Sequence, residues 1–108
     1  MRFFLCLFFT VGCSVYYQDI ELKRATEALN TGDYNKAVYH YQRIIKKSPE
    51  QPYALKAAEN AANVSLLKLK DFLKAINFFE FIVLYSKNEL QRIEAQEQIA
   101  FIYYERLN

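Results

Sequence analysis

Two stretches of the chain share one pattern of apolar and polar positions. In each, an Asp is followed directly by an aromatic residue, and a Lys, an Ala and an aliphatic residue occupy the third to fifth positions after the Asp. The patterns start at Asp33 and Asp71, so the displacement is 71 − 33 = 38 residues. Tyr41 and Phe79 keep this displacement, as do the aliphatic pairs that follow them. A constant period of this length predicts stacked helical hairpins.

The spacing of apolar residues predicts five helices. The first is expected to begin near Asp19 and to run to Thr31, with Gly32 ending it in the left-handed conformation. The third is expected from Pro52 to about Leu69, because a proline suits the first turn of a helix, where its missing N–H costs nothing. The other three are expected over residues 34–47, over residues 72–85, and from about residue 89 to the C-terminus.

Short polar side chains mark the starts of three helices. Asp33 and Asp71 stand where a helix needs an N-cap, which is a better interpretation of them than a pair of catalytic carboxylates. The segment from Asn88 to Gln91 has the form of a capping box. Because the turns are short, consecutive helices are expected to be antiparallel neighbours. The sequence therefore predicts an all-α solenoid of two helix hairpins plus one C-terminal helix.

Composition narrows the classes of function. A chain of 108 residues, 53% of them hydrophobic and 24% charged, has the size and character of one globular domain. The net charge is +2 and the basic residues are spread along the chain, so no nucleic-acid partner is expected.

Candidate chemistry is sparse. The single histidine, His40, has no carboxylate three or four residues further along, so we expect it on the surface rather than as a ligand or a base. The sequence offers no Gly-rich phosphate loop, no paired cysteines and no Ser-His-Asp set. It predicts no catalytic site, no metal site and no cofactor, and therefore a protein that is not an enzyme.

The N-terminus carries an export pattern. Arg2 precedes an apolar run over residues 3–11, which is too short for a bilayer because about 20 apolar residues are needed to span one. The run ends in Thr10-Val11-Gly12-Cys13, which resembles the lipobox of bacterial lipoproteins, where the cysteine is acylated and becomes the new N-terminus.

This resemblance implies a signal peptide over residues 1–12 and a lipidated Cys13 that begins a tether over residues 13–17. Acyl chains would attach the domain to a membrane, since each buried methylene contributes about 0.8 kcal/mol. The alternative is that residues 3–11 form a helix that packs on the domain, with Cys6 and Cys13 as small buried apolar residues.

The repeated unit itself resembles the tetratricopeptide repeat, in which small and aromatic residues interlock within a helix hairpin. The resemblance covers about residues 18–108 and implies repeat one over about 18–51, repeat two over about 52–87 and a half repeat over 88–108. The residues that carry it are Ala25, Gly32, Asp33, Tyr34, Ala37, Tyr41 and Pro49 in repeat one, and Asp71, Phe72, Ala75 and Phe79 in repeat two.

Long units together with an acylated N-terminus are similar to the periplasmic tetratricopeptide proteins of Gram-negative bacteria. Two types come nearest: the lipoprotein of the outer-membrane β-barrel assembly machine, and the cell-division coordinator that works beside the Tol-Pal system. In the repeat family, the first helix of each pair lines a concave face. Carried over by repeat position, that face is expected to be a mostly apolar partner-binding groove formed by Leu22, Thr26, Leu29, Asn60, Val64, Leu67, Phe101 and Tyr104.

The leading hypothesis is a lipid-anchored protein–protein interaction adaptor. It would sit at the periplasmic face of the outer membrane, bind another envelope protein or a peptide segment, and assist outer-membrane protein assembly or envelope maintenance. For the location, the alternative is the periplasm without the anchor. For the groove, the alternative is that its residues are interior or are covered by the last helix.

A second hypothesis is a homo-oligomer formed through the C-terminal helix. Phe101, Ile102, Tyr103 and Tyr104 point all round a helix and cannot all face one neighbour. A third hypothesis is that the chain is a remnant of a longer repeat protein.

Overall fold

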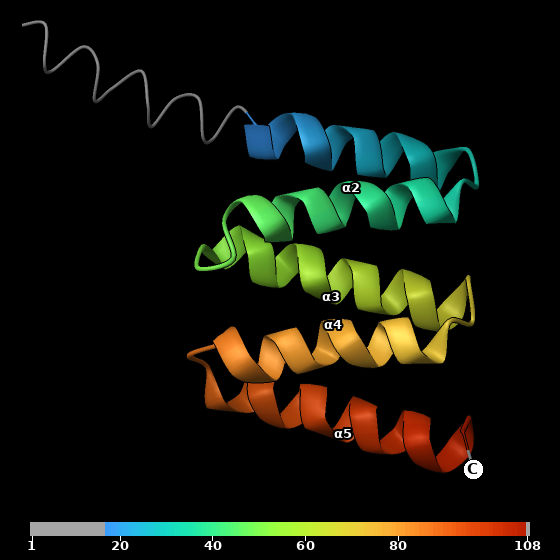
Figure 1. Cartoon of the computed structure of the whole chain (residues 1–108), viewed down its shortest axis with the longest axis vertical. Helices are drawn as coiled ribbons and strands as arrows, with labels where there is room; N and C mark the ends of the chain where they lie inside the picture. The colour runs from blue at the N-terminus through green and yellow to red at the C-terminus, as the bar shows by residue number, and fades with distance from the viewer. Residues whose placement is uncertain (1–16, 108) are drawn as a thin grey trace, which may run out of the picture.

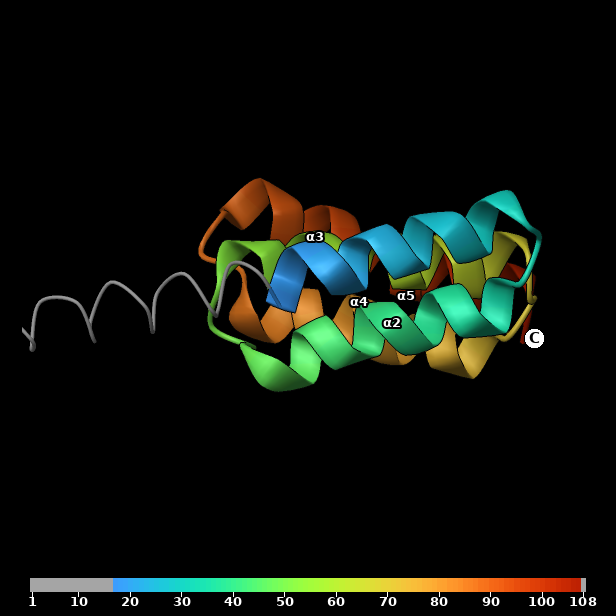
Figure 2. The same cartoon turned by 90° about the horizontal axis from the view of Figure 1, so that it is seen from above.

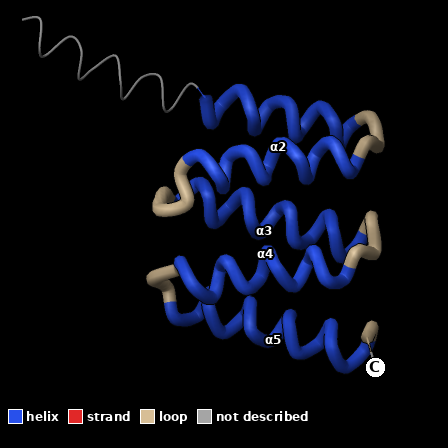
Figure 3. Tube along the Cα trace, viewed as in Figure 1, coloured by secondary structure: helices blue, strands red, loops and turns tan. Residues whose placement is uncertain are grey.

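The structure is a computed structural model that describes residues 17–107. Within this range the chain forms five helices and no strand (Figure 1, Figure 3). Turns of three or four residues join the helices, and consecutive helices run antiparallel. The prediction of an all-α stack of antiparallel helices is confirmed. The helices are residues 17–30, α2 (Tyr34–Lys47), α3 (Pro52–Leu67), α4 (Phe72–Tyr85) and α5 (Glu89–Glu105).

The helices form a stack with the core inside it. Helix 17–30 and α3 lie on one side of the stack, and α2 and α4 lie on the other (Figure 2). Helix α3 packs against α2 and α4, and α4 packs against α5. Small and aromatic residues fill the space between the helices, and the buried core includes Ala25, Ala28, Ala37, Tyr41, Ile44, Ala75, Phe79, Ile82, Ala95 and Ile102.

The second helices of the two hairpins repeat each other closely. The Asp33 carboxylate accepts a hydrogen bond from the Lys36 backbone N–H at 3.2 Å, and Asp71 accepts one from Lys74 at 3.2 Å. Both Asp residues therefore cap helices, as predicted. The buried residues of α2 and α4 keep the displacement of 38, as in the pairs Ala37 and Ala75, Tyr41 and Phe79, and Ile44 and Ile82.

The first helices follow a different displacement, because the turns that end them differ in length. Residues 31–32 separate helix 17–30 from Asp33, the N-cap of α2, whereas residues 68–70 separate α3 from Asp71, the N-cap of α4. The displacement between the first helices is therefore 38 − 1 = 37 residues. It matches the buried residue Ala25 with the buried residue Ala62, which are both 0% exposed.

Both turns place a residue in the left-handed conformation directly before the capping Asp. Gly32 has a φ of 78°, and a Cβ added there would meet nothing within 4 Å. Lys70 takes the same place in the second turn with a φ of 52°. A side chain in this conformation costs about 1 kcal/mol relative to glycine, so the second turn is strained where the first is not.

Alanines let α3 lie close to its neighbours on both sides. A helix face without large side chains permits a short distance between helix axes, and close packing then excludes voids. Five alanines of α3 are at most 3% exposed, namely Ala54, Ala57, Ala58, Ala61 and Ala62.

Two helix ends and one capping pattern differ from the sequence prediction. Residues 17 and 18 are already helical, so Asp19 does not cap the first helix. Helix α3 ends at Leu67 rather than Leu69, because the longer turn takes up the residues that follow. Asn88 does cap α5, accepting from the Gln91 N–H at 3.0 Å, but the Gln91 side chain bonds the Ser86 hydroxyl instead of completing the capping box.

The predicted signal peptide over residues 1–12, the lipidation of Cys13 and the tether lie outside the described residues, apart from the last tether residue, Tyr17, which is helical. Within residues 17–107, no helix has the length and apolar character needed to cross a bilayer.

Candidate functional site

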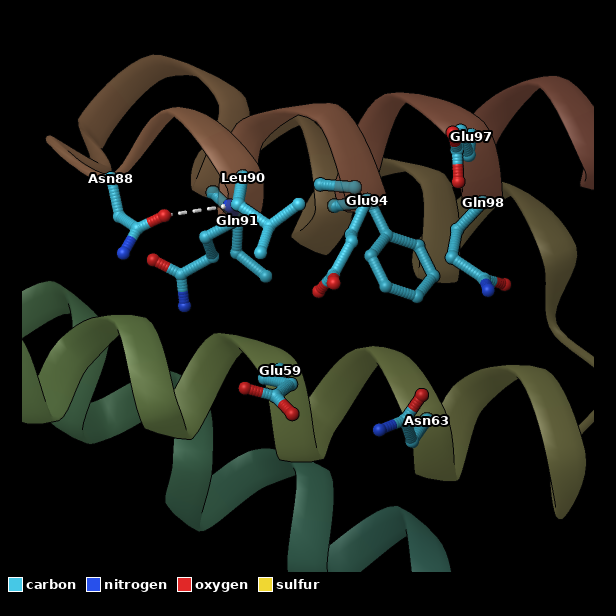
Figure 4. A pocket seen from close by; sticks show the side chains of 11 residues that line it. Glu59, Asn63, Asn88, Leu90, Gln91, Glu94, Glu97 and Gln98 are labelled. Carbon is cyan, nitrogen blue, oxygen red and sulfur yellow. Dashed lines mark hydrogen bonds between the residues drawn. The ribbon is translucent and has the colours of Figure 1, made fainter.

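A hollow of about 490 Å³ opens between α3 and α5 (Figure 4). Glu59 and Asn63 of α3 face the hollow from one side, and Gln91 and Glu94 of α5 face it from the other. Phe79 and Ile82 of α4 and Ala95 of α5 also line it, together with Asn88, Leu90, Glu97 and Gln98.

The hollow is acidic. Its lining contains three carboxylates, from Glu59, Glu94 and Glu97, and no lysine or arginine. The Lys56 ammonium approaches the Glu59 carboxylate at 3.9 Å, but Lys56 is largely exposed, so this pair offsets little of the negative charge. The side-chain amides add hydrogen-bonding groups, and Phe79 and Ile82 add apolar contact. Such a lining suits a cationic side chain that carries an apolar neighbour.

The hollow exists because α5 lacks the alanines of α3. The N-caps of the two helices are Gln51 and Asn88, which are 88 − 51 = 37 residues apart. With this displacement, three buried alanines of α3 correspond to long polar side chains of α5. These long side chains of α5 line the hollow. The corresponding pairs are Ala54 and Gln91, Ala57 and Glu94, and Ala61 and Gln98.

The predicted groove residues do not line this hollow. Leu22, Thr26, Leu67, Phe101 and Tyr104 are exposed on the helices, whereas Leu29 and Asn60 are partly buried. Val64 is only 9% exposed and belongs to the core, so its assignment to an accessible groove is wrong.

The physical reason is the length of the turn after α3. The prediction carried the displacement of 38 onto the first helices, where 37 applies, and was therefore one residue out of register on α3. In the correct register, Leu22 and Thr26 correspond to Glu59 and Asn63, which do line the hollow. This lining is polar and acidic rather than mostly apolar. Whether the other predicted residues bind a partner stays a prediction.

A buried polar cluster joins helix 17–30 to α2. Glu21 is 1% exposed, and its Oε2 lies 2.7 Å from His40 Nδ1. Its other oxygen lies 3.3 Å from Arg43 Nε and 3.5 Å from an Arg24 nitrogen. We call Glu21, Arg24, His40 and Arg43 the polar clasp. His40 is 6% exposed, so the prediction of a surface histidine is wrong. Its carboxylate partner comes from the preceding helix, 19 residues earlier, and not from its own.

Arg43 extends the polar clasp to the start of the first helix. It donates a hydrogen bond to the Tyr39 hydroxyl at 2.9 Å, and its guanidinium carbon lies 6.0 Å from the centre of the Tyr17 ring. Hydrogen bonds to Tyr39 and Tyr17 and the charge of Glu21 raise the pKa of Arg43 above its ordinary value. Arg43 therefore stays charged and ties the end of α2 to the beginning of helix 17–30.

The second hairpin has apolar residues where the first has the polar clasp. Glu21 corresponds to Ala58 by the displacement of 37, and His40 and Arg43 correspond to Phe78 and Phe81 by the displacement of 38. In α4, Phe78 and Phe81 form part of a surface hollow shared with α2. Of the ionisable side chains at these positions in the first hairpin, Glu21 and His40 are buried and Arg43 is partly exposed.

The remaining observations do not assign a known activity. Within residues 17–107, no three side chains of His, Cys, Asp or Glu come together as a metal site. No protein family model, curated protein or solved structure matches the chain. The function is therefore inferred from the hollow and from the surfaces of the helix stack.

Proposed function

We propose that this chain is a non-catalytic protein–protein interaction scaffold of the tetratricopeptide type, and that the hollow between α3 and α5 binds a segment of another protein. The observation that supports this proposal is the hollow itself. Two helices that do not follow each other directly in the chain supply side chains that face one another across about 490 Å³. Polar groups beside an apolar floor are typical of a binding surface.

The lining defines the chemistry of the segment. The carboxylates of Glu59, Glu94 and Glu97 would attract a lysine or arginine, and charge complementarity of this kind gives specificity and a faster encounter. The apolar floor formed by Phe79 and Ile82 would accept an apolar side chain next to the cation. We therefore propose a basic, partly apolar segment as the occupant.

The N-terminal pattern supports a place in the cell envelope. An acylated Cys13 would hold the domain at the periplasmic face of the outer membrane, with a soluble periplasmic location as the alternative. The partner would then be another envelope protein, and the scaffold would assist outer-membrane protein assembly or envelope maintenance. The basis for this proposal is the apolar run followed by Gly12-Cys13 and the resemblance of the repeats.

Two charge-neutralising substitutions test the hollow. The tagged full-length protein would be extracted from membranes with its partner, and the captured partner would be identified and its affinity measured directly. Replacing Glu59 and Glu94 with Gln keeps the shape of the hollow and removes two charges. We expect the affinity to fall about tenfold or more, since each lost charged hydrogen bond contributes about 1.5–3 kcal/mol before solvent screening.

The matched control is Glu80→Gln, which removes a carboxylate from an exposed position of α4 outside the hollow. This variant should bind as the wild type does. Equal affinity of the wild type and the Glu59/Glu94 variant for the captured partner would contradict the assignment of the hollow as the binding site.

The anchor has a separate test. Cells would be fed a fatty acid that carries a clickable group, and the label on the protein would be compared between the wild type and Cys13→Ala. We expect label on the wild type and none on the variant. An unlabelled wild type, or label that survives in the variant, would refute the lipid anchor and leave the interaction scaffold standing.

A further inference from the structure

A second cavity, of about 540 Å³, lies in the first hairpin and shares no residue with the hollow between α3 and α5. It is close to the turn at residues 31–33, at the opposite end of the hairpin from residue 17 (Figure 1). Helix 17–30, the turn and α2 all contribute to it. We call this cavity the turn pocket, and its lining consists of Arg24, Glu27, Ala28, Thr31, Lys36 and His40.

His40 presents one ring nitrogen to the turn pocket. Its side chain is only 8% exposed, and Nδ1 lies 2.7 Å from the carboxylate of Glu21, which is not part of the lining. Within residues 17–107, no protein group forms a hydrogen bond with the other ring nitrogen, Nε2. Nε2 is also not sealed from solvent, since the fully buried side-chain atoms without a partner in this range are Arg43 Nε and Ser65 Oγ. Nε2 is therefore the nitrogen that the ring offers to a ligand in the pocket.

Two positively charged side chains line the pocket together with His40. A guanidinium has five N–H donors, and one nitrogen of Arg24 approaches Glu21, at 3.5 Å, so further donors remain for the pocket. Among the described residues, no carboxylate lies within ion-pairing distance of the Lys36 ammonium. Glu27 also lines the pocket, and its carboxylate offsets part of this positive charge.

Packing of the hairpin does not require these polar groups. Arg24 corresponds to Ala61 by the displacement of 37, and His40 corresponds to Phe78 by the displacement of 38. Ala61 and Phe78 are both buried, so the same places in the second hairpin are filled by apolar side chains. A buried imidazole with an unpartnered nitrogen, next to two cations, thus calls for an explanation other than packing.

We propose that the turn pocket binds a phosphate group, free or esterified, through Arg24, Lys36 and Nε2 of His40. Guanidinium and ammonium groups are strong donors to phosphate oxygens. Phosphate also matches both protonation states of the ring. A neutral ring that donates from Nδ1 to Glu21 accepts at Nε2 from a phosphate hydroxyl, whereas a charged ring donates from Nε2 to a phosphate oxygen. A carboxylate has acceptors only and matches the charged ring alone. This site is independent of partner binding in the hollow between α3 and α5.

The chain has one histidine, so the ring of His40 can be observed directly. The full-length protein, in detergent micelles and without a histidine tag, would be isotope-labelled at histidine nitrogen alone for NMR. Inorganic phosphate, glycerol phosphate and acetate would be added separately at about pH 7 and at constant ionic strength. We expect a saturating shift of the Nε2 signal with phosphate, and binding of acetate about threefold to tenfold weaker, since a hydrogen bond is lost. Tighter binding of glycerol phosphate than of inorganic phosphate would assign an esterified phosphate as the ligand, and the reverse order would assign free phosphate.

Three substitutions separate the pocket from a general effect of charge. Lys36→Gln should weaken phosphate binding about threefold or more, and Glu27→Gln should strengthen it about twofold, because the two changes remove charges of opposite sign from the lining. Lys23→Gln is the matched control, since Lys23 is exposed on helix 17–30 but lies outside the lining, and it should bind as the wild type does.

Circular dichroism would check that the three variants remain helical. The proposal is overturned if phosphate gives no saturating shift, if acetate binds as tightly as phosphate, if Lys36→Gln and Lys23→Gln have the same effect, or if Glu27→Gln weakens binding.

Discussion

The polar clasp makes a quantitative prediction, because the second hairpin shows what could replace it. The substitutions are Glu21→Ala and His40→Phe, singly and together, which install the residue types of Ala58 and Phe78. His40→Phe removes a 2.7 Å hydrogen bond to a carboxylate that is 1% exposed. A hydrogen bond to a charged group contributes about 1.5–3 kcal/mol, and Glu21 would keep only its arginine partners. We expect a loss of stability of about 2–3 kcal/mol.

Glu21→Ala leaves His40 without its hydrogen-bond partner. The His40 side chain is only 8% exposed. Without Glu21, one of its ring nitrogens would lose its hydrogen bond, at a cost of about 1–3 kcal/mol. Replacing both residues removes the unpaired carboxylate and the unpaired imidazole together, whereas Arg43 loses its counter-charge as it does in Glu21→Ala. Replacement of a buried ion pair by apolar residues is often neutral or stabilising. We therefore expect the double variant to lose clearly less stability than the sum of the two single losses, although Arg43 keeps it below the wild type.

Urea unfolding followed by far-ultraviolet circular dichroism measures all four proteins. With an m-value of about 1–2 kcal/mol per molar urea, the midpoint should fall by about 1–3 M in His40→Phe and by about 0.5–3 M in Glu21→Ala. The double-mutant cycle then yields the coupling between the two residues. Strictly additive losses, or a His40→Phe variant within about 0.5 kcal/mol of the wild type, would refute the polar clasp as an energetic unit.

Three further predictions concern single side chains. Lys70→Gly should stabilise the fold by about 0.5–1 kcal/mol, measured by urea unfolding, because the φ of 52° at Lys70 favours glycine. Ser65→Ala should be neutral or stabilising by up to about 1 kcal/mol in a thermal melt, since the buried Ser65 hydroxyl has no hydrogen-bond partner among the described residues. Burial raises the pKa of Tyr41 above its ordinary value of 10.0. The folded chain therefore holds the phenolic proton more tightly than the unfolded chain, so the free energy of unfolding should fall as pH rises above 10. The urea midpoint of Tyr41→Phe should fall less over the same pH range.

Local signals in the sequence were sufficient for the helices. Asp33 and Asp71 cap the helices that follow them because an N-cap depends on a few neighbouring residues, and the buried faces of α2 and α4 follow from helical spacing. Long-range geometry was not accessible in the same way. The partner of His40 lies 19 residues away on another helix, and no spacing rule within one helix could identify it.

The predicted groove is one residue out of register on α3. A single additional residue in the turn before Asp71 changes the displacement of the first helices from 38 to 37, and each side chain on α3 then lies about 100° further round the helix than expected. Val64 consequently points into the core, and Glu59 and Asn63 face the hollow. The two repeated Asp motifs gave the displacement of 38 for the second helices. Comparing the lengths of the turns before Asp33 and Asp71 would have given the displacement of 37 for the first helices.

The position of α5 at one end of the stack has a consequence for its persistence. In the described chain α3 packs against two helices, whereas α5 packs against α4 alone, so we expect α5 amides to exchange with solvent faster than those of α3. Yet α5 carries most of the hollow's lining. Any occupant of the hollow would slow α5 amide exchange, because binding that requires the folded helix shifts the folding equilibrium of α5 toward the folded state. Binding at the hollow and folding of α5 are therefore coupled.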